Sequence, residues 1–198
     1  MVKPYLVVIT GRPGSGKTTL AGELSRAACL PVISRDRLKE GYVRTMGVPD
    51  SQLPGDVNRI VTELFFETIE KLIDGGVSLI AEAAFQHKVW SPKLGPLMDK
   101  ARVRVIVCSP GEDGRLALER FLKRGLSDPM REYFHGDKGV HMAREGQEVP
   151  VSAYEEPRLD APAWHVDTSD GYRPGIEELT EALFPESIIE NQGGSSYE

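Results

Sequence analysis

The residues best suited to chemistry lie in one glycine-rich segment near the start of the sequence. Residues 11–18 read Gly-Arg-Pro-Gly-Ser-Gly-Lys-Thr. Glycines let the backbone curl so that successive N–H groups point at phosphate oxygens. A lysine in this position reaches the β- and γ-phosphates, and the hydroxyl after it can ligate Mg²⁺. The pattern predicts a nucleoside triphosphate site, with Thr18 as a magnesium ligand, formed by Gly11, Arg12, Pro13, Gly14, Ser15, Gly16, Lys17, Thr18 and Thr19.

Two carboxylates follow strand-like segments and could act on a second substrate. Asp36 comes directly after residues 31–34, and Glu82 directly after residues 77–81. In an open parallel sheet, ligands bind beyond the carboxyl ends of the strands. Asp36 could accept the proton of an attacking hydroxyl, or it could cap the helix that follows. Glu82 could hold a magnesium-bound water or the acceptor, or form a structural salt bridge. We expect Arg35, Asp36 and Glu82 to contact the acceptor.

Two arginines lie four residues apart, immediately before an unusual segment. Arg120 and Arg124 share one face of a predicted helix, and residues 125–162 after it are rich in proline, glycine and charge. A long interruption of this kind is more often a functional lid than a linker. An arginine at a lid can neutralise the charge that develops during phosphoryl transfer. The two arginines are therefore predicted to be catalytic, with a solvated basic helix end as the alternative.

The elements that must position these residues alternate between strands and helices. An apolar run over residues 5–9 predicts the first strand, and leucines four residues apart predict a helix over 18–28. Asp56 is predicted to cap a long helix that ends at Gly75-Gly76, and a helix starting at Ser91-Pro92 should break at Gly95-Pro96. We predict further strands over residues 31–34, 77–81, 103–108 and 163–166, and helices from 36, over 113–124 and over 176–183.

This alternation predicts an α/β fold in which helices cover both faces of a five-stranded parallel sheet. Residues 1–184 would form one domain with the lid, residues 125–162, inserted in it. The polar residues 185–198 contain Gly-Gly-Ser-Ser and are predicted to be a flexible tail.

Composition limits the classes of protein to consider. The 198 residues are 40% hydrophobic and 27% charged, and 24 Lys and Arg against 30 Asp and Glu give a net charge of −6. This balance argues against a uniformly basic nucleic-acid or membrane binder. Two cysteines and the lack of a long apolar run favour a cytoplasmic protein with no membrane association.

The ends of the predicted strands favour a small kinase over other nucleotide-binding proteins. Strand 103–108 runs into Ser109-Pro110, where a GTPase would need Asn-Lys-x-Asp to read guanine. Strand 77–81 is followed by the single carboxylate of Glu82, where motor ATPases carry two acidic residues. A small kinase needs one acceptor-activating acid and a lid, and both are present in the pattern.

These motifs resemble the P-loop kinases related to the 5′-hydroxyl polynucleotide kinases, zeta toxins and antibiotic phosphotransferases. Residues 11–19 resemble the phosphate loop of that group, residues 33–36 (Ile-Ser-Arg-Asp) its Ile-Asn-Arg-Asp, and residues 120–125 its Arg-x-x-x-Arg-Gly. The resemblance implies a three-layer P-loop NTPase fold, Asp36 as the general base and Arg124 on the nucleotide phosphates. It also places residues 167–171 beside the adenine ring, although this stretch could be a plain turn.

The sequence departs from the polynucleotide kinases at the acceptor side. Glu82 stands where those kinases usually have aspartate, and neither Gln86-His87 nor the lid residues 127–135 match them. Four basic residues near Asp36 could bind phosphate or could be a solvated helix face: Arg35, Arg37, Lys39 and Arg44.

The predicted function is an ATP- and Mg²⁺-dependent phosphotransferase that moves the γ-phosphoryl group of ATP to a hydroxyl of a small molecule, such as a nucleoside-like metabolite or an antibiotic. A 5′-hydroxyl nucleic-acid end is the alternative acceptor. A nucleotide-binding regulator without an acceptor is a further alternative. The sequence does not define the oligomeric state.

Overall fold

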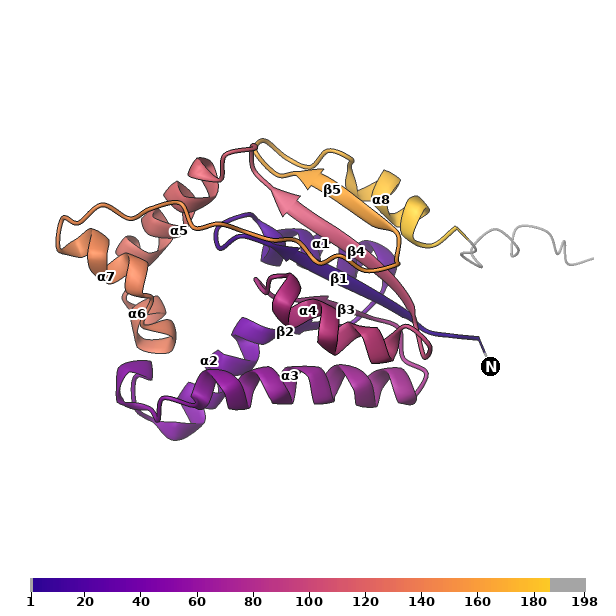
Figure 1. Ribbon diagram of the computed structural model, residues 1–198, viewed down its shortest axis with the longest axis horizontal. Coiled ribbons are helices and arrows are strands. Elements are labelled where there is room, and N and C mark those ends of the chain that lie inside the picture. Colours follow the sequence, from indigo (N-terminus) through magenta and orange to yellow (C-terminus); the bar gives the residue numbers. More distant parts are fainter. Residues whose placement is uncertain (1, 186–198) are drawn as a thin grey trace, which may run out of the picture.

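The central sheet has five parallel strands in the order β2-β3-β1-β4-β5 (Figure 1). The structure, a computed structural model, describes residues 2–185. The strands are β1 (Tyr5–Gly11), β2 (Val32–Ser34), β3 (Leu79–Glu82), β4 (Arg102–Ser109) and β5 (Ala163–Asp167). The predicted five-stranded parallel sheet is therefore confirmed, and strand three is shifted so that Glu82 is its last residue.

Helices cover both faces of the sheet, because successive side chains of a strand point to opposite faces. Leu6 and Val8 of β1 are fully buried among residues of α3 (Val57–Asp74) and α4 (His87–Leu94). Val7 and Ile9 are fully buried on the other face, with residues of α1 (Lys17–Ala28) and α8 (Ile176–Leu183). These two hydrophobic cores confirm the three-layer α/β fold.

The remaining helices project beyond the carboxyl ends of the strands, at the left of Figure 1. They are α2 (Arg35–Met46), the short 3₁₀ helix η1 (Asp50–Gln52), α5 (Arg115–Ser127), α6 (Pro129–His135) and α7 (Lys138–Arg144). The predicted lid, residues 125–162, thus contains the end of α5, two short helices and an irregular segment, residues 145–162, which we call the strap. The strap returns the chain across the sheet to β5 (Figure 1).

One predicted helix start and one predicted helix cap differ from the structure. The helix expected to begin at Ser91 begins at His87, whose backbone N–H donates to the carbonyl of Glu155 in the strap, at 2.9 Å. It ends at Leu94 and gives way to a second 3₁₀ helix, η2 (Gly95–Leu97), so the predicted break is confirmed. Asp56 precedes α3 as predicted, but its carboxylate accepts from the Arg59 guanidinium, at 3.0 Å, and caps no backbone amide within the described residues.

Most of the predicted tail, residues 186–198, lies outside the described residues. Within residues 2–185, no helix is both long enough and apolar enough to cross a membrane.

Candidate active site

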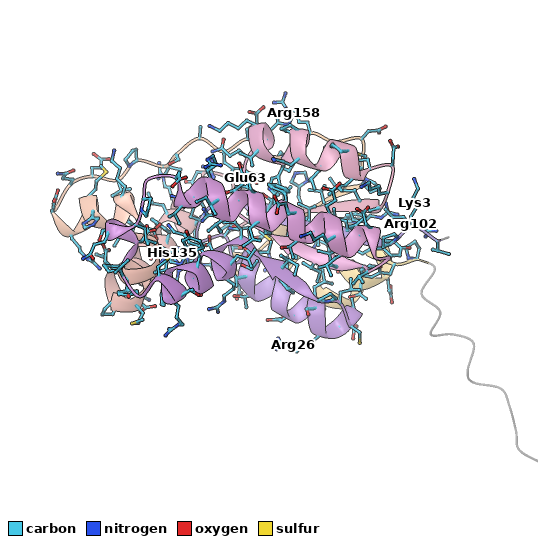
Figure 2. The ribbon with its side chains drawn as sticks, turned by 90° about the horizontal axis from the view of Figure 1, so that it is seen from below. Lys3, Arg26, Glu63, Arg102, His135 and Arg158 are labelled. Atoms are coloured by element: carbon cyan, nitrogen blue, oxygen red, sulfur yellow. The ribbon has the colours of Figure 1, made fainter. Side chains whose placement is uncertain are left out.

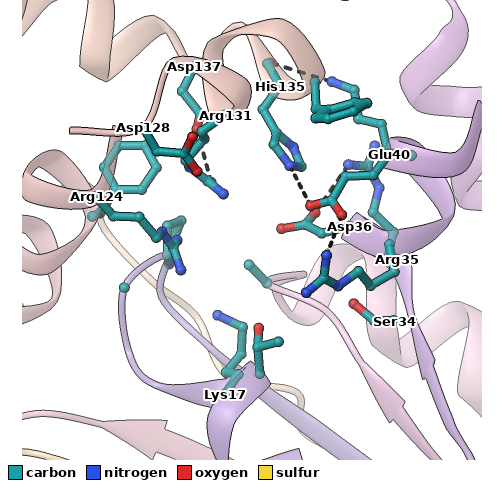
Figure 3. A pocket seen from close by; sticks show the side chains of 18 of the residues that line it. Lys17, Ser34, Arg35, Asp36, Glu40, Arg124, Asp128, Arg131, His135 and Asp137 are labelled. Atoms are coloured by element: carbon teal, nitrogen blue, oxygen red, sulfur yellow. Dashed lines mark hydrogen bonds and ion pairs between the residues drawn. The ribbon is translucent and has the colours of Figure 1, made fainter. Parts of the chain in front are cut away.

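A cavity of about 880 Å³ opens at the carboxyl ends of the strands. Figure 3 shows that it lies between the glycine-rich loop, the start of α2 and the lid helices. It is lined by the loop residues Pro13, Gly14, Gly16, Lys17, Thr18 and Thr19, by Ser34, Arg35, Asp36, Arg37, Lys39, Glu40, Asn58, Glu82 and Ala84, and by the α5–α7 residues Arg120, Phe121, Arg124, Asp128, Met130, Arg131, Phe134, His135, Gly136, Asp137 and Lys138.

The glycine-rich loop has the backbone geometry expected of a phosphate cradle. Gly14 and Gly16 have φ angles of 83° and 81°, in the left-handed region that favours glycine. Gly14 also packs against α5, where a Cβ atom would overlap the carbonyl of Ala117. Lys17 opens α1 and is buried, and its Nζ donates to the carbonyl of Arg12 at 2.8 Å. Burial lowers the pKa of Lys17, and the nearby carboxylate of Glu82 partly opposes this effect.

Three of the predicted phosphate-binding residues do not line the cavity: Gly11, Arg12 and Ser15. The guanidinium of Arg12 donates to the carbonyl of Ser152 and lies over the ring of Tyr154, 5.7 Å from its centroid. Arg12 therefore joins the glycine-rich loop to the strap. Its side chain is not directed at the predicted phosphate site.

Asp36 lies in the first turn of α2 and faces the cavity, and 51% of its side chain is exposed. Ser34 occupies the N-cap position of α2, so Asp36 is not the helix cap. Burial raises the pKa of the Asp36 carboxyl, but His135, Arg35, Lys17 and Arg131 together outweigh it, so that the pKa lies below its ordinary value. Asp36 is therefore ionised at neutral pH, as a proton acceptor must be.

Glu82 ends β3 beneath the cavity and is buried. Its carboxylate accepts a hydrogen bond from the Ser34 hydroxyl at 2.7 Å. Burial raises the pKa of Glu82, while Lys17, Ser34 and Thr18 lower it. Within residues 2–185 no cation lies within ion-pair distance of Glu82, so the structural salt bridge considered above does not form.

The oxygen atoms around Thr18 suit Mg²⁺. Thr18 and Glu82 both line the cavity, and Thr18 lowers the pKa of Glu82. Mg²⁺ takes oxygen ligands, and in nucleotide sites one or two protein oxygens are completed by waters and phosphates. The described residues contain no group of three or more His, Cys, Asp or Glu that could hold a metal ion by themselves. This donor set fits an ion that shares its ligands with a nucleotide.

The two predicted catalytic arginines of α5 differ in their contacts. Arg120 donates to the backbone carbonyls of Thr168 and Ser169, at 2.8 and 2.7 Å. Arg124 extends into the cavity, across from Asp36 (Figure 3), and its guanidinium has no hydrogen-bond or ion-pair partner among residues 2–185. Partial desolvation lowers the pKa of Arg124, and the neighbouring Arg131 lowers it further.

Sequence reasoning missed the cavity residues on α6 and between α6 and α7, in particular Arg131, His135 and Asp137. A local signal for α6 was present, because Asp128 followed by Pro129 is typical of a helix start. The Asp128 carboxylate indeed accepts from the backbone N–H of Met130 at 2.9 Å. A helix placed there would have marked these residues as candidates.

The loop after β5 contains the plain turn considered for residues 167–171, and its position beside the adenine ring stays a prediction. The Asp167 carboxylate accepts from the Ser169 backbone N–H at 2.8 Å, which is a plain turn. The Thr168 hydroxyl also donates to the Ser15 carbonyl at 2.8 Å, so the same turn is attached to the glycine-rich loop.

A parallel sheet with this strand order, a glycine-rich phosphate loop after β1 and helices over the cavity together define a P-loop kinase-like protein. The chain belongs to the zeta toxin family, whose model matches residues 2–149. No curated protein matches the chain in sequence.

Several solved structures have the same fold. A candidate kinase from Chloroflexus aurantiacus J-10-fl is 23% identical, with a TM-score of 0.74, over 94% of this chain and 100% of that chain. The Mycobacterium tuberculosis APS kinase CysC, in complex with AMPPNP and APS, is 17% identical, with a TM-score of 0.53, over 93% and 95% of the two chains. A chain of the Pnkp1/Rnl/Hen1 complex is 18% identical, with a TM-score of 0.53, over 85% of this chain and 48% of that chain.

Proposed function

We propose that this protein transfers the γ-phosphoryl group of ATP to a hydroxyl group of a small molecule. One observation carries the proposal: a single cavity holds Lys17, Asp36 and Arg124, which come from three different elements. A phosphate-binding cation, a carboxylate base and a free guanidinium are the groups that such a transfer needs.

The glycine-rich loop and Lys17 would bind the phosphates of ATP. The positive end of α1 and the loop N–H groups attract the phosphate oxygens, and Lys17 neutralises their charge. Mg²⁺, held by Thr18 with Glu82 nearby, supplies further charge neutralisation when bound. The Lys17 Nζ donates to the Arg12 carbonyl of the loop itself, which keeps it at the cradle.

Asp36 and Arg124 would act on the transfer step. Asp36 accepts the proton of the acceptor hydroxyl, the hydroxyl oxygen forms a bond to the γ-phosphorus, and the bond from that phosphorus to the bridging oxygen of ADP breaks. A positioned base of this kind contributes about 10²- to 10⁴-fold in rate. Arg124 donates to the equatorial oxygens, where negative charge spreads during the transfer.

A 5′-hydroxyl nucleic-acid end is the second candidate acceptor. It is favoured by the basic residues Arg35, Arg37 and Lys39, which all line the cavity beside Asp36. A binding protein without an acceptor would have the same nucleotide site, and the experiment below separates it from both kinases.

The test is a screen with γ-labelled ATP against sugars, nucleosides, antibiotics and 5′-hydroxyl oligonucleotides. Lys17→Ala should abolish transfer and weaken ATP binding strongly, whereas Asp36→Asn should abolish transfer and leave ATP affinity near that of the wild type. Asp99→Asn removes an exposed carboxylate far from the cavity and is the matched control. Near wild-type transfer by Asp36→Asn would refute the base assignment, and tight ATP binding without any labelled product would favour the binding protein.

A further inference from the structure

The two ends of the cavity differ in how their cations are balanced. At the glycine-rich loop, the Lys17 ammonium donates to a backbone carbonyl at 2.8 Å and Arg124 extends freely into the cavity. Within residues 2–185 neither cation has a carboxylate at ion-pair distance. Lys17 is also buried, where an unbalanced charge is costly. This end of the cavity is therefore prepared for an anion, as expected of the ATP side.

At the acceptor end, around Asp36, the cations already have carboxylate partners. Four ion pairs join the basic residues to neighbouring acids, and their lengths are 3.5, 2.7, 2.9 and 2.9 Å for Arg35–Asp36, Arg37–Glu40, Lys39–Asp50 and Arg131–Asp137, respectively. Lys39 is the most deeply buried of these cations, with 4% of its side chain exposed, and Arg35 and Arg131 are 13% and 14% exposed. Arg35, Lys39 and Arg131 are thus paired within the protein, and the charge of Arg37, whose side chain is 73% exposed, is screened by water.

One further cation lines this end without a described partner. Lys138 is exposed at the start of α7, and the exposed carboxylate of Asp128 lines the cavity as well. A solvated lysine attracts an anion weakly, because water screens its charge. Lys138 therefore does not make the acceptor end an anion site.

A phosphate at the acceptor end would have to compete with these carboxylates for their cations. Displacing Asp137 from Arg131, or Asp50 from Lys39, would leave a largely desolvated carboxylate without its partner, which is strongly unfavourable. A hydroxyl compound meets no such obstacle, because the carboxylates can accept hydrogen bonds from its hydroxyl groups and the amide N–H groups of Asn58, which lines the cavity, can donate to them.

We infer that the acceptor is an uncharged, hydroxyl-rich small molecule that carries no phosphate or carboxylate near the reacting hydroxyl. The inference rests on the proposed function and defines the acceptor class for the same site. It assigns an anionic ligand to the end with Lys17 and Arg124, and a neutral ligand to the end with Asp36.

Contacts across the acceptor end also limit the size of the ligand. The Lys39 Nζ lies 2.9 Å from the Asp50 carboxylate and donates to the His135 carbonyl at 3.5 Å. His135 Nε2 lies 3.2 Å from the Glu40 carboxylate, so α2, η1 and α6 are joined where α6 meets α2 (Figure 2). A polynucleotide continues beyond its first nucleotide and could not leave the cavity between α6 and α2. The joined helices favour a compact acceptor.

The experiment compares acceptors that differ by one anionic group. The full-length protein and γ-labelled ATP are tested with glucose against gluconate and glucose 6-phosphate, with inositol against inositol phosphate, and with nucleosides against nucleoside 3′-monophosphates and 5′-hydroxyl oligonucleotides. In each series that reacts, we expect kcat/KM for the neutral member to be at least 10-fold higher. Preference for the charged member would overturn the inference and leave the proposed function standing. Absence of labelled product from every acceptor would overturn the proposed function, and the inference with it.

Two further measurements test the ion pairs directly. Asp137→Asn frees Arg131, and we expect it to shift the kcat/KM ratio about 10-fold toward the charged acceptor. Asp74→Asn is the matched control, because it breaks an exposed ion pair with Lys100 outside the cavity and should leave the ratio unchanged. With the wild type, millimolar inorganic phosphate should compete with ATP and not with the acceptor. An unchanged ratio in a folded Asp137→Asn protein, or competition of phosphate with the acceptor, would overturn the inference.

Discussion

Arg120 and Arg124 lie one turn apart on α5, yet one is fully bound by the protein and the other is free. The Arg120 guanidinium donates to the carbonyls of Thr168 and Ser169, and so ties α5 to the loop after β5. That loop is itself attached to the glycine-rich loop through the Thr168 hydroxyl. The Arg124 guanidinium reaches into the cavity and has no partner among residues 2–185. We propose that Arg120 is a positioning residue and Arg124 a catalytic one.

This division predicts different losses in the two alanine variants. Arg124→Ala should lower kcat by about 10³-fold, because a contact to the transition state is lost. It should leave the free energy of unfolding unchanged, because the Arg124 guanidinium makes no hydrogen bond or ion pair within the described residues of the folded protein. Arg120→Ala should lower the free energy of unfolding by about 1–3 kcal/mol, because two carbonyls lose a charged donor. Steady-state kinetics and urea unfolding measure the two effects. Lys123→Ala, which removes an exposed cation from the same helix, is the control.

The outcome that contradicts this division is a reversal of the two phenotypes. A stable Arg120→Ala protein with a kcat as low as that of Arg124→Ala would make both arginines catalytic. An unfolded or strongly destabilised Arg124→Ala protein would show that Arg124 has a structural role.

Two glycines that are close in sequence should respond in opposite directions to alanine. Gly14 has a φ of 83°, and a Cβ there would overlap the Ala117 carbonyl of α5, so Gly14→Ala should destabilise the protein by at least about 1–3 kcal/mol and weaken ATP binding. Gly22 lies inside α1, and no atom lies within 4 Å of the position that an added Cβ atom would take. Gly22→Ala should stabilise by about 0.5–1 kcal/mol. Urea unfolding and nucleotide titration measure both. Equal behaviour of the two variants would contradict the packing of the glycine-rich loop against α5.

Features encoded by neighbouring residues were predictable from the sequence. The complete burial of Leu6, Val7, Val8 and Ile9, on alternate faces of the sheet, follows from a short apolar strand that is covered on both faces. The glycines before Lys17 mark the cradle because their backbone angles are accessible to few other residues. The position of the cavity, at the carboxyl ends of the strands, then follows from a general rule for parallel sheets.

Contacts between distant parts of the chain were not predictable in the same way. Arg12 looked like a phosphate ligand because of its place in the motif, but it binds Ser152 of the strap, 140 residues away. Lys39 looked like part of a basic helix face. It is instead buried, and its charge is paired with the carboxylate of Asp50 from η1. Such contacts depend on the path of the lid and of the loop after α2, for which local patterns give no distance information.

The buried Lys39–Asp50 pair should be strongly coupled. Asp50→Ala leaves the Lys39 charge buried without its carboxylate, and should lower the free energy of unfolding by about 3–5 kcal/mol. The double variant with Lys39→Met should lose less, because the unpaired charge is removed too. Urea unfolding of the single and double variants gives the coupling energy. A loss in the double variant equal to the sum of the losses in Asp50→Ala and Lys39→Met would show that the pair is not coupled.

The charge state of Asp36 makes a prediction about pH. Burial raises its pKa, and the nearby His135, Arg35 and Lys17 outweigh this, so the pKa lies below the ordinary value of 3.8. The proton-accepting form is then fully present above that pH, and its stabilising ion interactions are lost as pH falls through the folded-state pKa. We therefore expect no acid limb from Asp36 in the kcat profile between neutral pH and the ordinary carboxyl range.

Carboxyl ¹³C NMR titration measures this pKa directly. Arg35→Gln removes a cation 3.5 Å from the Asp36 carboxylate and should raise the pKa of Asp36. Arg37→Gln removes a cation that pairs with Glu40, and it should leave the pKa of Asp36 where it is. A wild-type pKa above the ordinary value, or the same response to both substitutions, would mean that the cations around the cavity do not hold Asp36 in its ionised form, and the case for Asp36 as the base would then rest on position alone.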